Sequence, residues 1–130
     1  IEMHPEYGRA CKRILQDIQD ETLQGCCSVL VLGELIGVIK KFNKARVSLG
    51  LPLLQIREHI DAVLSLPIIW FDLELFIIKH AADYAYPIPG ADCLHLATMD
   101  VHSVGEIISA DSDFNKVPTI KRIGPLEYRA

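Results

Sequence analysis

The chain has 130 residues and a formal net charge of −4; half of its residues are hydrophobic and 23% are charged. This length fits one domain around a single core, and the composition excludes a disordered chain. The acidic balance does not indicate a general nucleic-acid binder. A nuclease that holds divalent cations must concentrate carboxylates, so that class stays open.

The first half of the chain is predicted to fold as helix, strand, helix and helix. Apolar residues recur every three or four positions over residues 5–24, which predicts a helix. Residues 26–28 follow as a short strand, and Ser28 is placed to cap a helix over residues 29–42. That helix is apolar nearly all round, so we expect it to be largely buried. Another helix is expected over residues 52–66.

The second half alternates strands with helices. Residues 68–71 form an apolar run of the kind found in parallel sheets. Helices are expected over residues 73–86 and 91–101, a β-branched strand around Ile107 and an edge strand over residues 119–123. Strands that alternate with helices predict an α/β fold, here a helix-rich, three-layer α/β/α arrangement with a mostly parallel central sheet.

The sequence predicts neither a membrane span nor a disulfide framework. The most apolar run, residues 63–78, is broken by Pro67 and Glu74. The cysteines have no Cys-x-x-Cys spacing, so we interpret them as reduced, mostly buried thiols of a cytosolic protein. They are Cys11, Cys26, Cys27 and Cys93.

Glu34 is a single acid within the apolar helix over residues 29–42. A carboxylate among apolar neighbours is costly unless it is paired or binds a cation. A capping-box role would need the acid at position 31, which is Val31. A structural and a functional role for Glu34 are both left open.

Asp92, Asp111 and Asp113 are the other acids of interest. Asp92 either complements the N-terminus of its helix or, since His95 and Leu96 are its helical neighbours, faces along the apolar stripe. Asp92 and His95 have metal-ligand spacing, but the sequence has no Glu-x-x-His partner, so His95 fits a core or supporting histidine better. Asp111 and Asp113 follow a strand, where acids either form a solvated turn with Asx-type hydrogen bonds or bind a ligand.

Basic residues at the end of the helix over residues 29–42 also have two interpretations. They either complement the helix dipole on a solvated face or contact phosphate. The candidates for phosphate contact in this helix and just after it are Lys40, Lys41 and Lys44, and a fourth candidate is Lys116 near the end of the chain.

Three stretches carry the acids, namely residues 28–34, 89–97 and 107–114. In this order and at these separations they resemble the PIN domain family (PilT N-terminus), metal-dependent nucleases that include the VapC-type toxins. The resemblance covers nearly the whole chain and implies a single PIN-like domain over residues 1–130.

The resemblance also implies roles for individual residues. Glu34, Asp92 and Asp111 match the acidic catalytic site of the family, and Asp113 would be a fourth or supporting carboxylate. These four would hold Mg²⁺ or Mn²⁺, hard cations that prefer oxygen ligands. Ser109 matches the small hydroxyl residue that precedes the last acids, and we assign it, with the four lysines, to substrate binding.

The chain departs from the family at its start. The family carries a first aspartate at the end of a central strand, followed by a helix, and the sequence has neither; residues 1–3 would be the tail of that helix. A missing central strand leaves its neighbours without hydrogen-bond partners, so we expect the natural protein to have residues before Ile1.

The function implied by the resemblance is a metal-dependent endoribonuclease that acts as the toxin of a toxin–antitoxin pair. The expected partners are RNA, an antitoxin protein and a second copy in a homodimer, and the expected location is cytoplasmic. The alternative is a degenerate PIN-like module that binds RNA or protein without cleaving. A third interpretation, a flavodoxin- or receiver-like α/β domain, fits poorly with the long apolar helix that carries Glu34.

Overall fold

The computed structural model describes residues 4–128, so residues 1–3, assigned above to the tail of a preceding helix, lie outside it. The first half contains α1 (Gly8–Gln19), β1 (Gly25–Ser28), α2 (Leu30–Ser48), α3 (Ile56–Leu64) and β2 (Ile68–Phe71). The second half contains α4 (Leu75–Ala82), α5 (Gly90–Val101), β3 (Glu106–Ile108), the 3₁₀ helix η1 (Ser112–Lys116) and β4 (Lys121–Ile123). The predicted order of helices and strands is confirmed.

The strands pair in parallel, in two separate sheets. In one sheet β1 lies beside β2 with Gly25 opposite Ile68, and in the other β3 lies beside β4 with Glu106 opposite Lys121. The predicted α/β class with parallel strands is therefore confirmed. Within residues 4–128 no strand joins β1 to β3, so the sheet is divided into two pairs.

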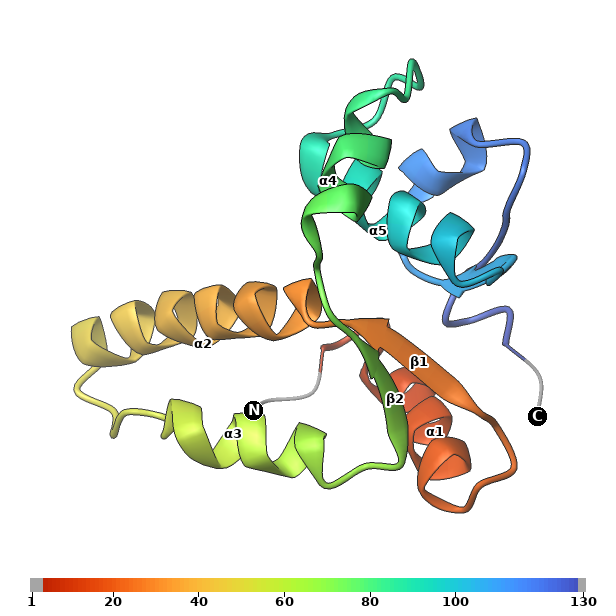
Figure 1. The fold of residues 1–130 in the computed structure, drawn as a ribbon. Coiled ribbons are helices and arrows are strands. Elements are labelled where there is room, and N and C mark those ends of the chain that lie inside the picture. Colours follow the sequence, from red (N-terminus) through yellow and green to blue (C-terminus); the bar gives the residue numbers. More distant parts are fainter. Residues whose placement is uncertain (1–3, 129–130) are drawn as a thin grey trace.

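Helices α2 and α3 form a hairpin that projects from the rest of the molecule (Figure 1). Ile39 of α2 is fully buried, but Val38 and Phe42 are 48% and 43% exposed. The prediction that this helix is largely buried is therefore wrong. The physical reason is that α3 covers one side of α2, whereas an apolar pattern all round a helix leads to burial only when neighbours cover every side.

The hydrophobic core that supports the second half lies between α4 and α5. Ile77 and Ala81 of α4 pack with Ala97 of α5, and Leu96 is fully buried. This packing fixes α5, whose first turn carries Asp92.

The four cysteines are free thiols, as predicted. Cys11 is exposed, and Cys26, Cys27 and Cys93 are half-buried, so the prediction of mostly buried thiols is wrong. Cys26 and Cys27 border a cavity beside β1, which explains their partial exposure. None of the helices in the described part of the chain is both long and apolar enough to cross a membrane.

Candidate metal centre

Three aspartates meet where α5 begins and β3 ends. Asp92 lies in the first turn of α5, and Asp111 and Asp113 lie in the turn that leads from β3 into η1. One carboxylate oxygen from each residue lies within 4.8 Å of the other two. The structure thus brings together three of the four predicted carboxylates.

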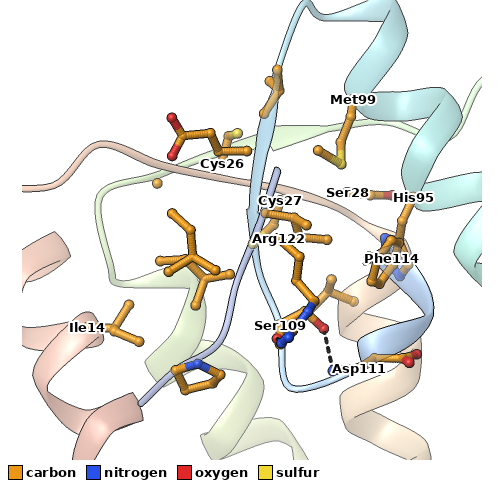
Figure 2. A pocket seen from close by; sticks show the side chains of 18 of the residues that line it. Ile14, Cys26, Cys27, Ser28, His95, Met99, Ser109, Asp111, Phe114 and Arg122 are labelled. Atoms are coloured by element: carbon orange, nitrogen blue, oxygen red, sulfur yellow. Dashed lines mark hydrogen bonds between the residues drawn. The ribbon is translucent and has the colours of Figure 1, made fainter. Parts of the chain in front are cut away.

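Hydrogen bonds hold the turn that carries Asp111 and Asp113. The Ser109 hydroxyl accepts a hydrogen bond from the Asp111 N–H (3.1 Å), and Asp111 Oδ1 accepts one from the Asp113 N–H (2.9 Å). Figure 2 shows the first of these bonds beside the cavity. The Asx-type turn considered from the sequence is therefore present, and it is what sets the positions of both carboxylates. Ser109, predicted to bind substrate, uses its hydroxyl within this turn.

Arg122 of β4 fixes the same turn, a role that the sequence interpretation missed. Its Nη1 donates to the carbonyl oxygen of Ser109 and its Nε donates to Asn115 Oδ1, both at 2.9 Å. The Arg122 side chain is 16% exposed, which is low for an arginine. The sequence signal was an arginine between two isoleucines of a predicted edge strand, Ile120 and Ile123.

Asp92 has the least favourable surroundings of the three aspartates. Its Oδ2 is buried and has no hydrogen-bond partner among the described residues. Burial, and then the negative charge of Asp111, raise the pKa of Asp92; Asp113 adds to this effect and His95 opposes it. A buried carboxylate oxygen without a partner, beside two further carboxylates, is an arrangement that a divalent cation stabilises. The oxygen donors of this cluster therefore fit Mg²⁺ or Mn²⁺.

Glu34 of α2 lies outside this cluster and is paired with a histidine instead. Its Oε1 accepts a hydrogen bond from His95 Nε2 at 2.6 Å. The Glu34 side chain is 50% exposed, so its expected burial is wrong, because α2 has an uncovered side. His95 lies one helical turn after Asp92 on α5, and all three residues line the same cavity.

Of the four lysines predicted to contact substrate, Lys116 lies beside the cluster. Its Nζ is 2.8 Å from Asp113 Oδ1 and 3.4 Å from the carbonyl oxygen of Pro87. The other three lie on the exposed part of α2, which leads away from α5 in Figure 1: Lys40, Lys41 and Lys44. At 1.5 Å of rise per residue they are roughly 9–15 Å further along α2 than Glu34.

A cavity of about 1380 Å³ lies between the two strand pairs. Cys26 and Cys27 of β1 and Ile107 of β3 line it, together with Asp92 and Asp111. Figure 2 shows side chains of both sheets around this space. Two residues of the acidic cluster thus border this cavity.

The model of the PIN domain family matches residues 4–120 of the chain. Searches of curated proteins and of solved structures returned no significant match. The matched range contains the four predicted carboxylates, Glu34, Asp92, Asp111 and Asp113.

Proposed function

Because the chain belongs to the PIN domain family, whose members are generally nucleases, we propose that it is a metal-dependent endoribonuclease. The observation that carries this proposal is the buried, unpartnered Oδ2 of Asp92 beside Asp111 and Asp113. If this carboxylate served only the fold, a neutral residue in its place would make the protein more stable, whereas a cation site needs the carboxylate.

The residues of the site would have separate roles. Asp92, Asp111 and Asp113 would hold Mg²⁺ or Mn²⁺, which when bound supplies Lewis-acid activation of water and of the RNA phosphodiester. Lys116, half-exposed beside Asp113, would contact a phosphate oxygen next to the cluster. Glu34 would provide the fourth carboxylate at the edge of the cavity. Phosphates further along a longer RNA would be contacted by Lys40, Lys41 and Lys44.

The biological setting is proposed from the resemblance to VapC-type toxins. In this setting the protein is a cytoplasmic toxin that forms a homodimer and is neutralised by an antitoxin protein. A co-purification of the natural protein from its source that yields neither a second copy nor a bound partner would contradict this part of the proposal.

We also propose that an extended segment preceding Ile1 fills the cavity between β1 and β3 and completes the PIN-like domain. The support for this is that each sheet has two strands within the described residues, while one cavity borders both β1 and β3. Two-stranded sheets are marginal by themselves, and an added strand would satisfy their open edges. A natural protein with an intact mass of 14.5 kDa, that of the 130 residues alone, would contradict this proposal.

The nuclease proposal is tested by RNA cleavage with Mn²⁺ or Mg²⁺, using the natural protein with any residues that precede Ile1. We expect cleavage that EDTA abolishes and that Asp92→Asn reduces at least about 100-fold, as expected for loss of a metal ligand. Asp83→Asn is the matched control, because Asp83 is an exposed residue at the C-terminus of α4. Cleavage that persists in EDTA or in Asp92→Asn would refute the site. Calorimetry that shows no metal binding would favour the alternative, a degenerate PIN-like module that binds RNA or protein without cleaving.

A further inference from the structure

The hydrogen bond between His95 and Glu34 joins two helices at the edge of the acidic cluster. His95 Nε2 lies 2.6 Å from Glu34 Oε1, and because a carboxylate only accepts, Nε2 carries the proton and donates. Glu34 lies on α2 and His95 on α5, 61 positions apart in the chain. The bond is thus a tertiary contact and not a local feature of one helix.

The two partners differ in how firmly they are held. The His95 side chain is 15% exposed, whereas that of Glu34 is 50% exposed. A half-exposed glutamate has three rotatable side-chain bonds and can turn its carboxylate toward water. The imidazole therefore acts as the fixed partner, and the carboxylate is the group whose position depends on the bond.

The position of His95 on α5 links this bond to the aspartates. Asp92 and His95 are three residues apart, so they lie on the same face of the helix, and both line the cavity with Glu34. Since Nε2 is engaged by Glu34, that nitrogen is not free to bind a cation directly. The arrangement is that of a histidine that orients a ligand from behind.

We propose that His95 is a positioning residue, which holds the Glu34 carboxylate at the cavity that Asp92 and Asp111 also line, so that Glu34 contributes to binding the same cation. This inference rests on the proposed function for the identity of the site. It goes beyond that function by assigning His95, which the sequence left open as a core or supporting histidine, the role of positioning Glu34.

The test is Mn²⁺ affinity, measured by electron paramagnetic resonance without RNA. His95→Leu removes the donor, and we expect about tenfold weaker Mn²⁺ binding, as for other residues that orient ligands. His95→Gln keeps an N–H donor near the position of Nε2 and should bind Mn²⁺ nearly as tightly as the wild type. Glu34→Gln should be as weak as His95→Leu, and the double variant should be no weaker than either single variant. His80→Leu removes an exposed histidine of α4 as the matched control.

Three results would overturn the inference. The first is an unchanged Mn²⁺ affinity in Glu34→Gln, and the second is additive losses of affinity in the double variant. The third is ¹⁴N coupling to bound Mn²⁺ that His95→Leu abolishes, because this coupling would make His95 a ligand. Glu34→Gln changes a half-exposed side chain, so it keeps the test decisive if His95→Leu does not fold. A protein that binds Mn²⁺ with this pattern but does not cleave RNA would refute the proposed function and support the role of His95. A wild type that binds no Mn²⁺ would overturn both.

Discussion

We expect Asp92 to lower the stability of the metal-free protein, because partial burial and the nearby charge of Asp111 raise its pKa. The pKa of Asp92 in the folded state is raised above the ordinary value of 3.8. At pH values between 3.8 and this raised pKa, the folded protein therefore binds more protons than the unfolded chain. Stability therefore falls as the pH rises through that window and stays lower above it. A neutral amide at position 92 removes this loss.

We expect Asp92→Asn to raise the melting temperature of the metal-free protein at pH 7 by a few degrees, which corresponds to about 1 kcal/mol in the free energy of unfolding. The difference should shrink as the pH falls through the window, because Asp92 in the wild type then becomes neutral as well. Calorimetry in EDTA at several pH values measures both effects, with Asp83→Asn as the control. If the variant were less stable than the wild type at pH 7, the charge of Asp92 would not be unfavourable in the folded protein.

Lys116 would compete with a bound cation for Asp113. Its ammonium lies 2.8 Å from Asp113 Oδ1, but the two side chains are 49% and 32% exposed, so water screens the pair. We therefore expect Lys116→Met to tighten Mn²⁺ binding only a few-fold. Lys40→Met, far along α2, should leave the affinity unchanged. Titration calorimetry measures both, and weaker binding in Lys116→Met would show that the ammonium supports the cation site.

The sequence could predict the acids of the site but not all of their surroundings. Asp111 and Asp113 could be placed because a strand end and a following Asx turn are local features. The partner of Glu34 could not, since it depends on how α2 and α5 meet in space. For the same reason the sequence did not separate Lys116, which is close to the cluster, from the lysines of α2.

At the scale of the element, α2 combines one fully buried position with a largely uncovered surface. Ile39 is 0% exposed and Val47 is 65% exposed on the same helix. We expect Ile39→Ala to lower the free energy of unfolding by about 3 kcal/mol and Val47→Ala by less than about 0.5 kcal/mol. Urea unfolding measures both. Equal losses would mean that a second surface covers Val47 in solution.

The positions of helices and strands were predictable because they depend on local signals. These signals are the spacing of apolar residues and the glycines and prolines that interrupt helices and strands. The Ser28 hydroxyl, expected to cap the following helix, accepts a hydrogen bond from the Leu30 N–H at 3.2 Å. Burial was less predictable. The pattern of α2 shows which residues are apolar, but the number of neighbouring elements is a tertiary property.

At the scale of the whole molecule, the sequence predicted strands that pair in parallel and alternate with helices, and the structure has them. It did not predict that β1–β2 and β3–β4 would form separate pairs with a cavity between them. Alternation of strands and helices indicates parallel pairing, but it carries no information on which strands are neighbours. The acidic cluster sits at this junction, since Asp92 and Asp111 both line the cavity.

We propose that Asp92, Asp111 and Asp113 together form a metal centre. Crystals of the protein soaked in Mn²⁺ test it most directly, because anomalous scattering locates the ion without assumptions about activity. We predict an anomalous peak within coordination distance of all three carboxylates, roughly 2.0–2.3 Å. No peak there at saturating Mn²⁺, while Mn²⁺ sites elsewhere are filled, would contradict a metal centre at these three aspartates.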